Sequence, residues 1–131
     1  MRRQFQMPEE DEEILNASGM KWETMKEGEV KWLILPEYHI PAGYNHAVVS
    51  AAFRIPPSYP DVGIDMVYFF PNLALASGKT IGALSTLRLD SKDYQQWSRH
   101  RTKQNPWRSD ADNIGTHLVL VKDWLNKELG K

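Results

Sequence analysis

Three prolines within five residues, in Pro56-Pro57-Ser58-Tyr59-Pro60, constrain the fold more than any other feature of this sequence. Each proline ring fixes φ, removes a backbone N–H and restricts the preceding residue, so a helix or a paired strand does not continue through this stretch. On either side lie runs rich in β-forming residues, at 46–55 and 64–70. We therefore expect two strands joined by a stiff, extended corner.

The remaining segments predict an α+β domain. Residues 1–8 indicate a flexible arm, and the acidic run that follows favours a short helix over 9–18. Alternating apolar residues at 21–25 and 30–35 predict a β-hairpin. Together with the strands around the proline corner, this hairpin gives a four-stranded antiparallel meander.

The C-terminal segment has the pattern of an amphipathic helix that packs on one face of the sheet. Ser109 or Asp110 is expected to cap its start. Apolar residues recur at steps of three and four, at Ile114, Leu118, Val121, Leu125 and Leu129. Residues 73–91 are less clear, with a short strand or an extended loop near 81–89. Residues 9–131 are thus expected to form a single domain.

Cysteine is absent from all 131 residues, which excludes disulfides, thiolate metal sites and cysteine nucleophiles. The formal net charge of −1 gives no general attraction to nucleic acid or to an anionic membrane. No apolar run reaches the length of a membrane span, and the N-terminus lacks the apolar core of a secretory signal. We therefore expect a cytoplasmic protein. No histidine pair has metal-ligand spacing and no phosphate-binding glycine motif is complete, so no metal and no cofactor are expected.

The stretch from Tyr94 to Arg101, together with residues 106–110 shortly after it, is the main candidate for a functional surface. It reads as one turn-rich, polar and aromatic connection, and loops carry function where scaffolds carry the core. His100 is its only residue that titrates near neutral pH. The ring would act as a general base or would be structural. A base would be assisted by a positive charge, from Arg99 or Arg108, and by an orienting carboxylate, from Asp110 or Asp112.

Other interpretations of this stretch stay open. Ser98 precedes Arg99 and His100 closely enough to suggest a serine nucleophile, although neighbours in sequence need not face each other. Trp97 and Trp107 suit core packing or the stacking of a ligand. Residues 92–108 are rich in lysine and arginine, which allows a small nucleic-acid-binding module.

Two motifs resemble the ubiquitin-conjugating (UBC) fold. A strand ends in Arg54-Ile55-Pro56-Pro57-Ser58-Tyr59-Pro60, and the next strand leads into Met66-Val67-Tyr68-Phe69-Phe70-Pro71-Asn72-Leu73. In ubiquitin-conjugating enzymes a Tyr-Pro corner and a Pro-Asn element lie in the same order. The resemblance implies an N-terminal helix, a four-stranded antiparallel meander, an irregular active-site segment and a C-terminal helix.

Further motifs are similar to the prokaryotic family E of ubiquitin-conjugating-like proteins. They are Leu35-Pro36, Pro41-Ala42-Gly43-Tyr44-Asn45, Tyr59-Pro60, Trp97-Ser98-Arg99-His100, Trp107-Arg108 and Asp112. The chain departs from ordinary conjugating enzymes at the thioester-forming cysteine, since Arg88-Leu89-Asp90 occupies about the place of their Cys-Leu-Asp. Phe70 also replaces their histidine before Pro71-Asn72. The resemblance therefore implies no thioester on this chain, and any activity would be a non-thiol acyl transfer.

The resemblance implies a ubiquitin-like protein and an activating-enzyme-like protein as partners. Our first hypothesis is that the protein handles a ubiquitin-like modifier of a bacterial system at a site around His100. The candidate catalytic residues are His100, Arg99, Ser98, Arg108 and Asp112, and the candidate binding residues are Trp97, Trp107, Tyr59 and Arg88. The alternatives are an inactive variant that binds such a partner non-covalently, and a nucleic-acid-binding module that uses residues 92–108.

Overall fold

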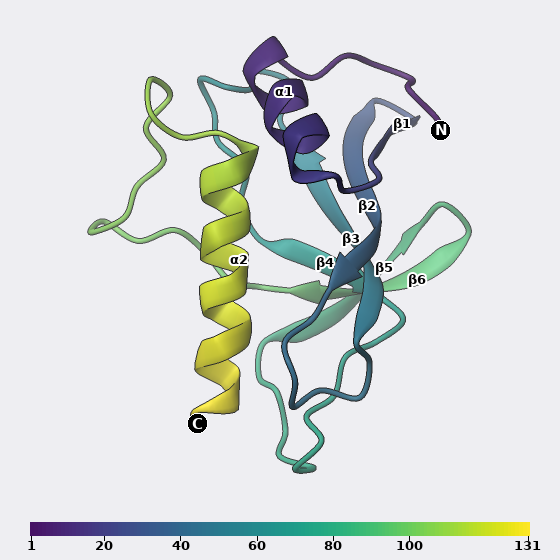
Figure 1. The fold of residues 1–131 in the computed structure, drawn as a ribbon, viewed down its shortest axis with the longest axis vertical. Helices are drawn as coiled ribbons and strands as arrows, with labels where there is room; N and C mark the ends of the chain where they lie inside the picture. The colour runs from purple at the N-terminus through teal and green to yellow at the C-terminus, as the bar shows by residue number, and fades with distance from the viewer.

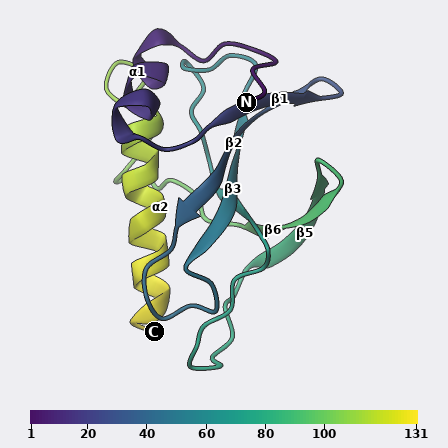
Figure 2. The ribbon, with the colours of Figure 1, turned by 45° about the vertical axis from the view of Figure 1, so that its right-hand side comes forward.

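The computed structural model describes residues 1–131 and has two helices on one face of an antiparallel sheet (Figures 1 and 2). The helices are α1 (Glu9–Ser18) and α2 (Ile114–Leu129). The strands are β1 (Glu23–Glu27), β2 (Val30–His39), β3 (Val48–Ile55), β4 (Val67–Phe70), β5 (Leu84–Leu89) and β6 (Lys92–Trp97). Their order across the sheet is β1-β2-β3-β4-β6-β5. The predicted α+β class and order of helices are confirmed, but the sheet has six strands instead of four.

The two additional strands form a hairpin where the sequence indicates irregular chain. β5 and β6 pair from Leu84↔Trp97 to Leu89↔Lys92, and β6 also pairs with β4. Tyr94–Trp97 is therefore part of an inner strand, and the prediction of a turn-rich connection is wrong for these residues. The polar side chain of Gln95 can be buried there because its hydrogen bonds are satisfied. Its amide oxygen accepts from the Leu73 N–H and its amide nitrogen donates to the Leu73 carbonyl, each at 3.0 Å.

The main core lies between the sheet and the helices. Alternate strand residues face it, as expected from the two-residue period of a strand, and they include Leu33, Phe53, Phe69 and Trp97. The opposite sheet face carries a smaller apolar cluster, which is formed by Met25, Trp32, Ile34, Ala52, Tyr68, Leu89 and Tyr94. No helix covers this second face (Figure 2).

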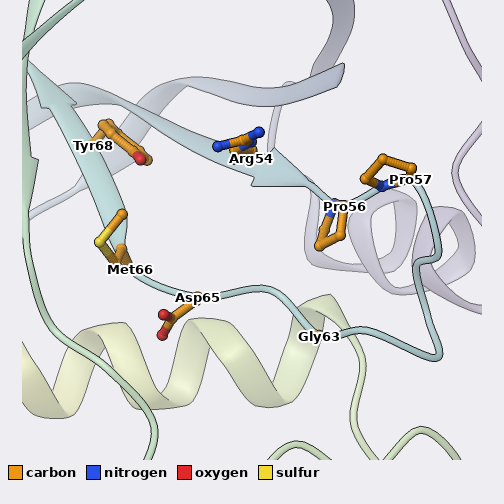
Figure 3. A pocket seen from close by; sticks show the side chains of 7 residues that line it. All are labelled: Arg54, Pro56, Pro57, Gly63, Asp65, Met66 and Tyr68. Carbon is orange, nitrogen blue, oxygen red and sulfur yellow. The ribbon is translucent and has the colours of Figure 1, made fainter. Parts of the chain in front are cut away.

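The proline corner joins β3 to β4 as predicted. Pro56 and Pro57 directly follow β3, and the chain returns through Gly63 and Asp65 to the start of β4 (Figure 3). The two strands pair antiparallel, with Ala51 opposite Phe69. The corner segment, residues 56–66, lies at the surface beside the end of the sheet and is anchored by Ile64, which is fully buried in the main core.

The start of α2 differs from the prediction. Asn113 is the N-cap, and it forms a capping box in which its side chain accepts from the Thr116 backbone and the Thr116 hydroxyl accepts from the Asn113 backbone. Ser109 and Asp110 precede the helix without capping it. The buried carboxylate of Asp11 in α1 accepts from the Ile114 N–H at 3.0 Å, which ties the two helices together. Neither helix combines the length and apolarity needed to cross a bilayer.

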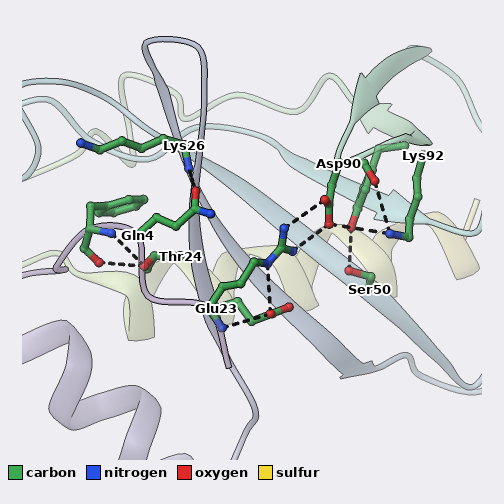
Figure 4. Close-up of polar contacts among 10 residues, drawn as sticks. Gln4, Glu23, Thr24, Lys26, Ser50, Asp90 and Lys92 are labelled. Atoms are coloured by element: carbon green, nitrogen blue, oxygen red, sulfur yellow. Dashed lines mark hydrogen bonds and ion pairs between the residues drawn. The ribbon is translucent and has the colours of Figure 1, made fainter.

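Residues 1–8, predicted as a flexible arm, lie along β1 (Figure 4). Thr24 donates its backbone N–H to the Arg2 carbonyl and accepts from the Gln4 N–H, both at 3.0 Å. The Arg2 guanidinium binds Glu23 on β1 and both carboxylate oxygens of Asp90 in the β5–β6 turn, the latter at 3.0 and 2.7 Å. Through this side chain the arm connects the two edge hairpins of the sheet.

Candidate functional site

The exposed pair formed by Asp65 and His100 is the most distinctive polar arrangement on the surface. Nδ1 of His100 lies 2.6 Å from Oδ2 of Asp65. Because a carboxylate only accepts, this nitrogen donates, and in the neutral form of the ring Nε2 is the nitrogen that carries the lone pair. The His100 side chain is 61% exposed, so Nε2 is accessible to a reacting group. The second carboxylate oxygen of Asp65 accepts from the backbone of Arg101 at 3.4 Å.

Two loops meet at this pair. Residues 98–113 form one of them, and its Trp107 ring packs against Tyr59 of the corner segment with the ring centroids 5.6 Å apart. The Trp107 indole donates to the Pro60 carbonyl at 2.7 Å. A methyl group added at Gly63 would lie only 2.1 Å from the same indole. A glycine is therefore needed at position 63 for the loops to approach this closely.

A second histidine, His117 of α2, lies beneath the corner segment and is fully buried. Nε2 of His117 donates to the Met66 carbonyl at 2.9 Å, and Nδ1 accepts from Arg101 at 3.4 Å. The ring also makes edge contacts with Phe53 and Trp124. Burial lowers the pKa of His117 to about 4, so the ring is neutral at pH 7.

Arg101 connects the buried histidine to the loop. Its guanidinium lies 4.9 Å from the Trp107 ring centroid and 3.7 Å from an Asp112 carboxylate oxygen. Asp112 in turn accepts from the Arg108 backbone N–H at 2.8 Å, and these contacts hold its pKa below the usual range despite the opposing effect of desolvation. Asp112 thus organises the loop and does not orient His100. That role belongs to Asp65, which lies 35 residues earlier in the chain.

Three of the candidate residues around Trp97 point away from His100. Trp97 is completely buried in the main core, so the prediction that it contacts a ligand is not supported. Arg99 stacks over Trp97 at 4.9 Å and binds the buried Glu128 of α2 at 2.9 Å. The Ser98 hydroxyl accepts from Gln96 at 3.4 Å. A serine–histidine arrangement is therefore not formed.

The other candidates are divided between the two loops and a distant hairpin. Tyr59 and Trp107 do meet, half-buried, next to the Asp65–His100 pair. Arg108 is an exposed residue whose backbone N–H is bound to Asp112. Arg88 lies on β5 and pairs with Asp93 at 3.0 Å on the exposed edge hairpin. No three histidine, aspartate or glutamate side chains converge as they would around a metal ion.

Sequence reasoning missed Asp65 and Arg54. Asp65 lies inside the run predicted as the fourth strand, where its only signal is that a charged residue interrupts β-forming residues. Arg54 is an exposed cation near the end of β3. It lines a pocket of about 280 Å³ together with Pro56, Pro57, Gly63, Asp65, Met66 and Tyr68 (Figure 3).

The N-terminal helix, the antiparallel sheet, the proline corner and the C-terminal helix together define the class of ubiquitin-conjugating-like, or E2-like, domains. The family profile of prokaryotic E2 family E matches residues 7–128, so the chain belongs to that family. It is thereby an E2-like protein of a bacterial ubiquitin-like system, one without a cysteine. Searches of curated proteins and of solved structures found no significant match.

Proposed function

We propose that this protein receives the C-terminal tail of a ubiquitin-like modifier at the Asp65–His100 pair and handles it without forming a thioester. The observation that carries this proposal is the geometry of the pair. Asp65 fixes the ring through Nδ1 and leaves an exposed Nε2, which is the arrangement of a general base.

In this role His100 accepts a proton from the amine or water that attacks the carbonyl group of the modifier's tail. As the new C–N or C–O bond forms, the bond between that carbonyl and the partner protein breaks, and the leaving group stays on the partner and takes the proton back from His100. The tail would arrive already activated on a partner protein, because no side chain of this chain can form a thioester. The contribution of the chain is then to position the tail and to accept the proton. The activating-enzyme-like protein that its family implies is the partner expected to supply the activated tail.

A second function, non-covalent binding of the modifier without chemistry, is favoured by one specific observation. The groups expected to stabilise a developing oxyanion are not gathered at His100, since Arg99 is bound to Glu128 and Arg101 to Asp112 and Trp107. In this case His100 would contribute a hydrogen bond to the modifier.

The nucleic-acid alternative has weaker support. Several cations of residues 92–108 already have carboxylate partners: Lys92 pairs with Asp90, Arg99 with Glu128 and Arg101 with Asp112. Fewer free positive charges remain to contact phosphate groups, so the electrostatic footprint is small. A steep loss of binding with rising salt would point to this alternative.

The test uses a ubiquitin-like protein and an activating-enzyme-like protein from the same bacterium, mixed with the full chain. His100→Ala should abolish processing of the modifier while its binding persists, and Asp65→Asn should have the same effect to a smaller degree. His39→Ala, which removes an exposed histidine of β2, is the matched control and should change neither. If processing survives in His100→Ala, the base role is wrong. If binding is lost as well, His100 is a binding residue, as in the second function.

A further inference from the structure

We infer that the pocket next to Asp65 binds the terminal carboxylate of a peptide tail, with Arg54 as the residue that recognises it. This inference rests on the proposed function, because the tail it names is that of the modifier received at the Asp65–His100 pair. It adds a second chemical form of the tail, the free acid, to the activated form that the proposed function concerns.

The charge state of the pocket supports this ligand. Of the residues that line it, only Arg54 and Asp65 are charged. Both oxygens of Asp65 are occupied, one by His100 at 2.6 Å and one by the Arg101 backbone at 3.4 Å. The backbone of Arg54 pairs with β2, but its guanidinium makes no hydrogen bond and no ion pair within the chain. The pocket therefore offers one unpaired positive charge to a ligand.

The shape of the arginine side chain selects a carboxylate. The planar guanidinium donates two parallel hydrogen bonds to the two oxygens of a carboxylate, which a terminal amide cannot reproduce. Figure 3 shows the guanidinium of Arg54 and the hydroxyl of Tyr68 turned toward each other, whereas the Asp65 carboxylate turns away from Arg54. Partial burial raises the pKa of Tyr68, which keeps its hydroxyl protonated as a further donor.

The walls of the pocket suit the end of an extended chain with small residues. Pro56 and Pro57 form an apolar side without backbone donors, and the backbone of Gly63 forms part of the wall. The volume of about 280 Å³ lies at the lower limit for ligand pockets, so it accommodates a short segment and not a large cofactor.

A neighbouring pocket lies over the start of β2 and the end of β3 and gives the tail a path out. A second pocket of about 400 Å³ shares Arg54 and Pro57 with the first and is lined further by Glu29, Val30 and Lys31. A peptide whose carboxylate binds Arg54 would extend over this second pocket toward the β1–β2 turn. The free carboxylate is the state of the tail before activation and after hydrolysis, so the pocket would hold the unconjugated modifier.

The probe is a synthetic hexapeptide that ends in Gly-Gly and carries a photoreactive phenylalanine at the third position from its C-terminus. It is prepared with a free carboxylate and, as the matched ligand, with a C-terminal amide. Binding to the full chain is measured by calorimetry, and the cross-linked residues are mapped by mass spectrometry. The wild-type protein should bind the acid about tenfold more tightly than the amide, as expected for one charge-assisted contact.

Arg54→Met should remove this preference, and Arg54→Lys, which keeps the charge but not the planar fork, should retain part of it. Lys122→Gln, on the exposed face of α2, removes one positive charge elsewhere and should leave the preference unchanged. Circular dichroism of each variant verifies that it is folded. Inorganic phosphate should displace the acid peptide only weakly.

Three results would overturn the carboxylate assignment. Equal affinity for acid and amide, with cross-links next to His100, would refute the role of Arg54 and leave the proposed function intact. Displacement by phosphate as effective as by the unlabelled peptide would identify a general anion site. Failure of both peptides to bind the folded chain would refute this inference, whereas the proposed function, which concerns the activated tail on its partner, is tested separately by His100→Ala.

Discussion

The two histidines on either side of the Asp65–Met66 segment have opposite environments. His100 lies outside it, exposed and bound to the Asp65 carboxylate, whereas His117 lies inside it, fully buried and bound to the Met66 carbonyl. Residue type alone does not distinguish them. Their surroundings do, because burial opposes a charged ring at His117, whereas the His100 side chain is 61% exposed to solvent.

This difference separates a structural region from a region available for function. Around His117, every polar contact serves the attachment of the loop to α2. Around His100, the pair with Asp65 adds little to stability, since an exposed ion pair contributes about 0–1 kcal/mol. The contrast leads to four predictions, which concern the buried region first.

Trp97→Ala should produce the largest loss of stability, about 4 kcal/mol, because it empties a fully buried ring position in the main core. Urea denaturation measures the change in the free energy of unfolding. Trp107→Ala, which removes a half-buried ring in the loop, is the comparison and should cause a clearly smaller loss. Equal losses would contradict the burial of Trp97 in the main core and the more peripheral position of Trp107.

Lowering the pH from 7 to 4 should reduce stability by about 3 kcal/mol through His117 alone. The folded pKa of His117 is about 4, below its ordinary value of 6.5, so the unfolded chain takes up a proton first. The stabilisation is therefore present above pH 6.5 and is lost as the pH falls toward 4. Arg101 lowers this pKa further, while Asp65 and Asp112 oppose the shift weakly.

His117→Gln removes the titrating ring and should flatten this part of the pH profile. The difference between wild type and variant isolates His117 from carboxylates such as Asp90 and Glu128, whose lowered pKa values affect stability at still lower pH. An unchanged slope between pH 6.5 and 4 in the variant would contradict the assignment of the neutral buried ring.

Gly63→Ala should cost about 2 kcal/mol, since the added methyl group must push the Trp107 indole away from the corner segment. Thermal denaturation with a fluorescence readout of tryptophan reports both the stability and the displacement. Gly82→Ala is the matched control, because no atom lies within 4 Å of the added methyl group there. A loss no larger than that of the control would mean that the two loops are not held together by Trp107.

His100→Ala should change the free energy of unfolding by no more than about 0.5 kcal/mol, because the side chain is 61% exposed and its partner 47%. The same urea denaturation experiment measures it. A loss above about 2 kcal/mol would place His100 among the structural residues and would remove the contrast with His117.

Periodic segments of the sequence predicted their structures well. The acidic start and Gly19 located α1, the alternation located the β1–β2 hairpin, and the prolines located the corner between β3 and β4. Each of these signals is local, so it is readable without the fold. The α2 cap was misplaced because Ser109, Asp110 and Asn113 all suit a cap, and only the contacts with Thr116 and Asp11 select Asn113.

The site was predictable only in part, because its geometry depends on distant residues. The loop around His100 stood out by composition, but its partner Asp65 precedes it by 35 residues and is brought close by the pairing of β4 with β6. The same pairing buries Trp97 and turns Arg99 toward Glu128. The sequence did not predict strand β6, because the polar residues Gln95 and Gln96 are more typical of a connecting loop than of an inner strand.

Histidine-ring ¹H–¹⁵N spectroscopy of the full chain, titrated with a ubiquitin-like protein from the same bacterium, tests the proposed site most directly. Without the partner, the His100 spectrum should show a protonated Nδ1 and a free Nε2 in its neutral form, as the hydrogen bond to Asp65 requires. On addition of the modifier, the His100 signals should shift while those of His39 and His117 stay unchanged. Unchanged His100 signals at saturating modifier would contradict the proposal that the modifier is received at this pair.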